Sequence, residues 1–196
     1  MTKLEAALLD LGAFLDELRI PYMVIGGFAN LYWGVERFTR DLDLTVEVAD
    51  EALPEVLRRL GERLVFAVSE PLTFARRNHL VRARVKSGVD VDLILAVLPY
   101  ELAAIRRAVT AEVSGGRIRM CSAEDLIIHK LASERPQDAV DVEGIVLRQA
   151  SRVDRDYLWP LVRDLAAGLE RPEIVGFLAR VLKDADSRTG GGGRDG

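Results

Sequence analysis

Two aspartates, Asp41 and Asp43, lie two positions apart in the segment RDLDLTVEV, residues 40–48. The segment alternates charged and apolar residues, which is typical of a β-strand with one packed face. Both carboxylates would therefore project from one face, about 7 Å apart along the strand. Burying one unpaired carboxylate costs free energy, and burying two close together costs more. We therefore expect a cation here, and Mg²⁺ suits oxygen ligands that water and phosphate complete.

A second acidic segment, GVDVDLILAV at residues 88–97, places Asp90 and Asp92 on one face of its strand. A single D-x-D pair is often only a solvated polar face, whereas two such pairs favour a metal site. Three carboxylates on neighbouring strands could hold two metal ions about 3.5–4 Å apart for an in-line displacement at phosphorus. Gly26 and Gly27, before the first acidic strand, would let backbone N–H groups approach an anion at the start of a helix.

The rest of the chain predicts the elements that must position these residues. The spacing of apolar residues predicts helices over residues 3–18, 50–64 (with Asp50 as N-cap) and 99–109. Short β-rich segments predict strands over residues 22–25, 40–48, 64–68, 72–77, 80–86 and 89–97. Gly-containing turns at residues 87–88 and 115–116 indicate hairpins. Together these elements predict a mixed α+β fold.

The chain is expected to have three parts. Residues 1–120 form the α/β core, and residues 121–185 form a purely helical region. The remaining residues, 186–196, include the low-complexity run GGGGRDG and are expected to be a disordered tail.

Composition limits the classes of function. The formal net charge is −4 and 49% of the residues are hydrophobic, which indicates a globular core and argues against a protein that coats nucleic acid. Cys121 is the single cysteine, so no intramolecular disulfide can form, and a cytoplasmic location is expected. No apolar run approaches the roughly 20 residues that cross a bilayer, so no membrane partner is expected.

The order of these features resembles the polymerase-beta-like nucleotidyltransferase superfamily. An apolar strand leads into Gly26-Gly27, and thirteen residues later comes Asp-Leu-Asp-Leu, followed by an acidic strand. The segments GGFANLYWGVERFTRDLDL, VDVDLILA and AEDLIIHKLASERPQDAVDVEGI most resemble the AbiEii-type toxin and minimal nucleotidyltransferase branch. The resemblance covers roughly residues 20–150. It implies a nucleotidyltransferase-fold mixed β-sheet flanked by helices, with a C-terminal helical bundle.

The resemblance also implies an activity and its residues. The activity is metal-dependent transfer of an NMP from an NTP to a hydroxyl acceptor, which could be RNA such as tRNA, a protein or a small molecule. Gly26 and Gly27 would bind the triphosphate, whereas Asp41, Asp43 and a third acid would bind Mg²⁺ or Mn²⁺. The third acid aligns best with Asp92, because the family continues from it into an apolar run like DLIL. Asp90 is the alternative position.

Lys130 is a further candidate catalytic residue. It lies on the packed face of the helix expected over residues 122–133, and Asp138 and Asp141 are neighbours on the next helix. One interpretation is a structural ion pair or a lysine that extends to water. The other is contact with nucleotide phosphates, and the AbiEii-like resemblance places Lys130 and Asp141 in the active site, with Asp138 as a weaker companion.

The segment RFTRDLD resembles the family pattern R-x-T-x-D-x-D and makes Arg37, Thr39 and Arg40 candidate nucleotide contacts. Either arginine could equally be a solvated loop charge. A basic stripe on the strand at residues 80–86 could approach an anionic acceptor or be an exposed sheet face; it consists of Arg82, Arg84 and Lys86.

Two other functions are compatible with the same residues. The fold could serve as a nucleotide sensor or as an interaction module of a toxin–antitoxin pair, with an antitoxin protein as partner. It could also carry out O-nucleotidylation of an antibiotic, because aminoglycoside-modifying enzymes share the fold that the resemblance implies.

Overall fold

The computed structural model describes residues 1–190 and divides the chain into two compact units. Unit 1 consists of Met1–Phe28 and Phe38–Ser122. Unit 2 consists of Ala29–Arg37 and Ala123–Gly196, of which the part up to residue 190 is described. Helix α2 (Gly26–Trp33) begins in unit 1 and ends in unit 2.

Unit 1 is built on one mixed sheet, whose strands within residues 1–190 follow the order β3-β4-β5-β2-β1-β7-β6. Neighbouring strands are antiparallel except β2–β5 and β1–β7, which are parallel. The strands are β1 (Tyr22–Ile25), β2 (Asp41–Val46), β3 (Leu64–Phe66), β4 (Leu80–Val85), β5 (Asp90–Leu95), β6 (Val109–Val113) and β7 (Gly116–Met120). This sheet, flanked by helices, confirms the predicted α+β fold class.

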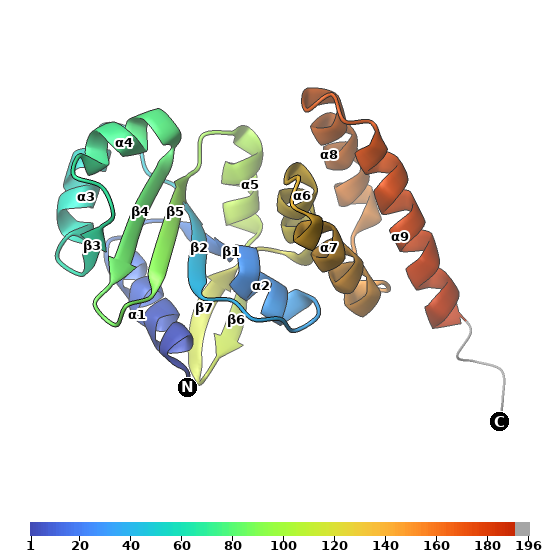
Figure 1. Ribbon diagram of the computed structural model, residues 1–196, viewed down its shortest axis with the longest axis horizontal. Helices are drawn as coiled ribbons and strands as arrows, with labels where there is room; N and C mark the ends of the chain where they lie inside the picture. The colour runs from blue at the N-terminus through green and yellow to red at the C-terminus, as the bar shows by residue number, and fades with distance from the viewer. Residues whose placement is uncertain (191–196) are drawn as a thin grey trace. The chain divides into compact units, whose positions relative to one another are not determined.

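Four helices accompany the sheet in unit 1: α1 (Lys3–Glu17), α3 (Leu53–Leu60), α4 (Pro71–Asn78) and α5 (Pro99–Arg107). Thr2 and Glu5 form a capping box at the start of α1, and leucines such as Leu8, Leu11 and Leu15 are buried along its packed face. Helices α3 and α4 lie at the β3–β4 edge of the sheet (Figure 1).

Two local predictions in this region are wrong. Residues 72–77 form helix α4 instead of a strand, because Pro71 near its first turn has a backbone angle suited to a helix start and lacks the N–H that a strand ladder needs. Asp50 is not the N-cap of α3, which begins at Leu53; its carboxylate instead accepts a 3.1 Å hydrogen bond from Arg76.

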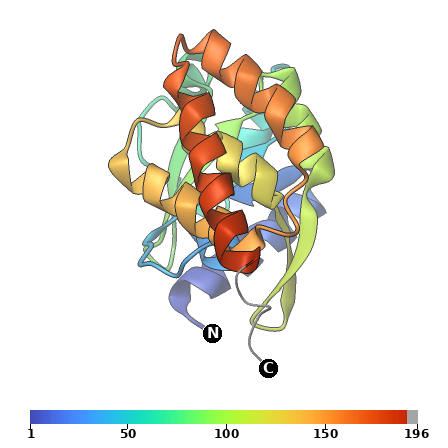
Figure 2. The ribbon, with the colours of Figure 1, turned by 90° about the vertical axis from the view of Figure 1, so that its right-hand side faces the viewer.

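The described part of unit 2 contains four further helices, α6 (Ala123–Ala132), α7 (Pro136–Gln149), α8 (Arg155–Gly168) and α9 (Glu173–Gly190). Helix α9 contacts both α7 and α8, and it faces the viewer in Figure 2. The Arg148 guanidinium donates to the Gly34 carbonyl, and the Gln149 amide donates to the Trp33 carbonyl at 3.1 Å, so α7 fixes the end of α2.

Helix α9 continues to Gly190, five residues beyond the predicted helical region. The rest of the predicted tail, residues 191–196, lies outside the described residues. Within residues 1–190, no helix combines the length and the apolar character that crossing a membrane requires.

Candidate active site

The two acidic strands lie side by side in the sheet of unit 1. The parallel register of β2 and β5 pairs Asp41 with Asp90 and Asp43 with Asp92. Paired residues on adjacent strands share one face, and such strands lie about 4.8 Å apart. The four carboxylates therefore occupy one face of the sheet, while the residues between them on β2 and β5 are buried on the opposite face.

The diglycine turn lies against this carboxylate face. Gly26 has φ +66°, a left-handed conformation that glycine adopts without strain, and a Cβ at this position would clash with the Asp43 carboxylate. A Cβ at Gly27 would clash with the Thr39 hydroxyl, which in turn donates a 3.1 Å hydrogen bond to the Asp41 carboxylate. Both positions therefore require glycine for the close approach of the first turn of α2 to these side chains.

The two candidates for the third acid have different environments. Arg84 Nε donates to Asp90 Oδ1 at 2.6 Å, and this hydrogen bond lowers the pKa of Asp90. Partial burial raises the pKa of Asp92, which has only a 3.6 Å ion pair with Arg82 to oppose it. The carboxylates of Asp41 and Asp90 raise the pKa of Asp92 further. Asp90 is thus paired closely with a cation, whereas Asp92 is only weakly paired and lies next to Asp43.

We expect Asp92→Asn to raise the melting temperature at pH 7 when no divalent metal is present. Because the pKa of Asp92 is raised on folding, its contribution to stability is full below about pH 4 and is lost as the pH rises through the folded-state pKa. The asparagine side chain is neutral at every pH in this range, so the variant does not lose this stability as the pH rises. Calorimetry from pH 3 to pH 8 should therefore show a gap between variant and wild type that closes at the acidic end.

Asp90→Asn is the matched control, since the pKa of Asp90 shifts in the opposite direction. Its melting temperature at pH 7 should be equal to or below that of the wild type. A lower melting temperature of Asp92→Asn at pH 7 would contradict this description of the carboxylate face.

The donor set of the carboxylate face fits a hard divalent cation. Asp41, Asp43 and Asp92 offer only oxygen atoms, and the excess negative charge around Asp92 favours a cation. Residues 1–190 contain no preformed group of three or more acidic, histidine or cysteine side chains that could hold a metal ion. Mg²⁺ commonly takes one or two carboxylates and completes its shell with water and substrate phosphates, so a preformed protein cage is not required.

A buried charge cluster lies in unit 2. Lys130, whose side chain is 3% exposed, donates from Nζ to Asp138 Oδ1 at 2.6 Å and to Asp141 Oδ2 at 2.7 Å. Arg37 donates through two nitrogens to the two oxygens of Asp141, each at 2.8 Å, and Arg135 Nε donates to Asp138 Oδ2 at 2.6 Å. We call these five residues the α6–α7 charge cluster.

Hydrogen bonds within the α6–α7 charge cluster outweigh the cost of burial. Burial raises the pKa of both aspartates, but hydrogen bonds from Lys130 and Arg135 to Asp138, and from Arg37 and Lys130 to Asp141, bring each pKa below its usual range. The geometry therefore matches the structural ion pair, which is one of the two interpretations that the sequence allows for Lys130. A catalytic role for Lys130 and Asp141 stays a prediction.

The structure thus gathers the predicted site residues into two groups. Unit 1 brings together Gly26, Gly27, Thr39, Asp41, Asp43 and Asp92. Unit 2 brings together Arg37, Lys130, Asp138 and Asp141. Arg40 belongs to neither set of contacts and lies over the Phe38 ring, 5.0 Å from its centroid.

Sequence reasoning missed Arg135 and the partners of the basic stripe. Arg135 lies three residues before Asp138, a spacing that places the two side chains together at the start of a helix. Arg82 and Arg84 pair with Asp92 and Asp90 across the β4–β5 hairpin. The Ser87-Gly88 turn fixes that register, so counting back from it would have found both pairs.

Solved structures share the fold of this chain. The chain is similar to an antigenic nucleotidyltransferase-like protein from Paracoccidioides brasiliensis, with 18% identity, 92% of both chains covered and a TM-score of 0.54. It is also similar to the lincomycin-bound lincosamide antibiotic adenylyltransferase LnuA, with 14% identity, 74% of this chain and 96% of that chain covered, and a TM-score of 0.50. At these identities the likeness shows a nucleotidyltransferase fold.

The family follows from the sequence. The model of the family described as "Nucleotidyltransferase of unknown function (DUF6036)" matches residues 2–171, and the chain belongs to this family. A search of the curated proteins found no match. These findings confirm the nucleotidyltransferase resemblance and do not confirm the AbiEii-type branch.

Proposed function

We propose that the protein transfers a nucleoside monophosphate from an NTP to a hydroxyl acceptor. The observation that carries the proposal is the register of β2 and β5, which sets Asp43 beside Asp92 on the face that also holds Asp41. The Gly26-Gly27 turn lies against the same carboxylates. A triphosphate bound at this turn would adjoin the carboxylates, as transfer at the α-phosphorus requires.

In the proposed reaction the acceptor oxygen forms a bond to the α-phosphorus, and the bond from this phosphorus to the pyrophosphate oxygen breaks. Backbone N–H groups at Gly26 and Gly27 donate to the triphosphate, aided by the positive end of α2. Asp92, which lies beside Asp43 on the carboxylate face, accepts the acceptor's proton. Asp41, Asp43 and Asp92 would hold Mg²⁺ or Mn²⁺, which would supply positive charge for the acceptor oxygen and the leaving pyrophosphate.

For the α6–α7 charge cluster, the contacts support a positioning role. The Lys130 ammonium already has two carboxylate partners within 2.7 Å, and Arg37 is held by both oxygens of Asp141. The alternative is that Lys130, Asp141 and Arg37 contact nucleotide phosphates, as the AbiEii-like resemblance implies. Thr39 is proposed to orient Asp41, and Arg40 is proposed as a contact for phosphate.

The proposed acceptor and the proposed protein partner can each be narrowed to a few classes. RNA such as tRNA, a protein or a small molecule could supply the hydroxyl group. The sequence resemblance supports a toxin of the AbiEii type with an antitoxin as partner. The fold shared with a lincosamide adenylyltransferase supports an antibiotic acceptor as the alternative.

A thermal-shift experiment separates catalysis from nucleotide sensing. We expect each of the four NTPs to raise the melting temperature only when Mg²⁺ or Mn²⁺ is present, because a shared triphosphate–metal complex binds the carboxylate face. At a ligand concentration 100 times the dissociation constant, the stabilisation would be about 2.7 kcal/mol. A shift by one nucleotide without metal would indicate a sensor and contradict the proposed enzyme.

The acceptor is identified with NTPs labelled at the α-phosphate. Purified protein, Mg²⁺ and each labelled NTP are incubated with a cell lysate, and RNA, protein and small-molecule fractions are counted separately. Incorporation of the α-phosphate label into one fraction identifies the class of acceptor. No transfer with any NTP, despite metal-dependent NTP binding, would leave the sensing module as the function.

A further inference from the structure

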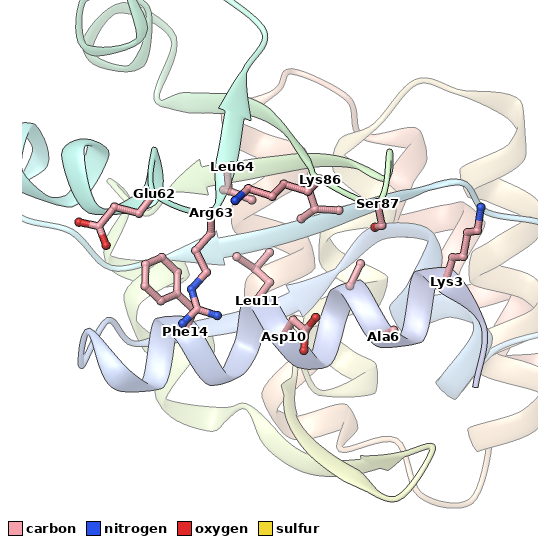
Figure 3. A pocket seen from close by; sticks show the side chains of 12 residues that line it. Lys3, Ala6, Asp10, Leu11, Phe14, Glu62, Arg63, Leu64, Lys86 and Ser87 are labelled. Atoms are coloured by element: carbon pink, nitrogen blue, oxygen red, sulfur yellow. The ribbon is translucent and has the colours of Figure 1, made fainter.

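Unit 1 has a hollow that does not belong to the carboxylate face. It has a volume of about 470 Å³ and lies between α1, the turn after α3, and the end of the β4–β5 hairpin (Figure 3). We call it the α1 pocket; its walls include Lys3, Asp10, Phe14, Arg63, Val85 and Lys86. Its volume is within the range of sites that bind small molecules, roughly 300–1,000 Å³.

The register of the sheet places the α1 pocket opposite the carboxylates. Arg82 and Arg84 pair with Asp92 and Asp90, so these side chains of β4 share the carboxylate face. Val85, the next residue along β4, points to the other face, where it pairs with Leu64 and lines the pocket. The α1 pocket is therefore separated from the candidate active site by the sheet.

The base of the α1 pocket is apolar. Leu11, Phe14 and Leu64 line it with their side chains nearly completely buried, and Ala6 leaves space above α1. The stretch of α1 from Lys3 to Phe14 gives the pocket a length of about 16 Å. An elongated apolar group can lie along this floor.

Several charged side chains at the rim of the α1 pocket have no hydrogen-bond or ion-pair partner among the described residues. Within residues 1–190, the side chains of Lys3, Asp10 and Lys86 take part in no hydrogen bond or ion pair. Arg63 has one ion pair, at 3.7 Å to Glu17, and lies over the Phe14 ring, 4.6 Å from its centroid. By contrast, exposed arginines elsewhere in unit 1 hold carboxylates at 2.6 Å. The remaining acidic residue of the lining, Glu62, is paired with Arg58 at 3.3 Å and with Arg59 at 3.4 Å. The pocket thus has more positive than negative charge that is open to a ligand.

The positive charges lie at both ends of the pocket. Figure 3 shows the Lys86 side chain extending toward the end that holds Arg63 and Phe14, while Lys3 lies at the other end and Asp10 between them. Two cations beside an aromatic ring favour an anionic group, and guanidinium and ammonium both bind carboxylate, sulfonate or phosphate.

We propose that the α1 pocket binds a small organic anion with an apolar body. The anionic group lies between Lys86 and Arg63, and the apolar body lies over Leu11 and Ala6 toward Lys3. Asp10 accepts a hydrogen bond from a hydroxyl or amine group on the ligand.

The test uses a matched pair of fluorescent probes, 1-anilinonaphthalene-8-sulfonate and the uncharged N-phenyl-1-naphthylamine. We expect the sulfonate to bind with a stoichiometry of one and more tightly than the uncharged probe. Lys86→Gln should weaken sulfonate binding about tenfold, as the loss of one charge-assisted contact predicts, and change binding of the uncharged probe less than about twofold. Ala6→Phe should weaken binding of both probes by filling the floor.

Three controls make the outcome decisive. Arg76→Gln removes an exposed charge on α4; neither Arg76 nor its partner Asp50 lines the pocket, so this variant should leave both affinities unchanged. Asp41→Asn with Asp43→Asn should also bind the sulfonate normally, which separates this site from the proposed transferase site. Melting curves verify that each variant is folded. Equal sulfonate affinity for wild type and Lys86→Gln, or equal affinity of the wild type for both probes, would overturn the proposal.

Discussion

Replacing Asp41 and Asp43 together by asparagine is expected to reduce nucleotidyl transfer by at least about 10³-fold, because the carboxylate face would lose two of the charges that hold a divalent cation. The fold should persist. Asparagine has nearly the same shape, and the substitutions remove like charges from one face of β2. The measurement is transfer of α-labelled NMP, combined with circular dichroism and a melting curve for the same preparations.

Asp90→Asn is the control for the double substitution. Asp90 lies on the same face and pairs in register with Asp41, but its carboxylate is bound to Arg84. We expect it to retain activity within about tenfold of the wild type. If the double variant is folded and keeps its activity while Asp90→Asn loses it, then the site does not use Asp41 and Asp43, and the proposed mechanism is wrong.

The acidic strands were predictable because their chemistry is local. Alternation over residues 40–48 and 88–97 fixes which side chains share a face, and it correctly placed the carboxylates on one face of each strand. The register between β2 and β5 is not local. It depends on the packing of Leu42, Leu44 and their neighbours beneath the sheet, so the pairing of Asp43 with Asp92 required the structure.

The errors have the same origin. Residues 72–77 contain β-branched and aromatic side chains that resemble a short strand, and the proline before them decides in favour of a helix. The partners of Arg82 and Arg84 were missed because they come from the next strand. In both places, the residue that determines the local structure or the pairing lies outside the segment from which the prediction was made.

Carboxylates in this protein show how environment sets the role of one residue type. Asp138 and Asp141 are buried, and cationic partners bring their pKa values below the usual range. Asp92 is less buried and weakly paired, and its pKa is raised. Carboxylates that already have cationic partners have little remaining charge for a ligand, whereas Asp92 can gain by binding a cation or a proton. This contrast is why we assign chemistry to unit 1 and positioning to the α6–α7 charge cluster.

Replacing Lys130 by methionine is expected to lower the free energy of unfolding by about 3–5 kcal/mol, because two buried carboxylates would lose their shared cation. Urea unfolding at pH 7, followed by circular dichroism, measures the loss. Arg155→Gln removes an exposed ion pair with Asp186 in the same unit and should cost at most about 1 kcal/mol. A cost for Lys130→Met no greater than that of Arg155→Gln would contradict the buried cluster.

The pH dependence gives a second measure of the α6–α7 charge cluster. Because folding lowers the pKa of Asp138 and Asp141, their stabilisation is present above about pH 4 and is lost as the pH falls through the folded-state values. Lys130→Met removes the strongest buried partner, so the difference from the wild type should shrink in acid. Adding Asp138→Asn and Asp141→Asn to Lys130→Met removes the two buried negative charges that lost Lys130 as a partner, and it should recover part of the stability. If this triple variant folds and transfers NMP, the α6–α7 charge cluster has a structural role in holding its helices in place. If the variant folds and is inactive, Lys130 or its partners act on the substrate.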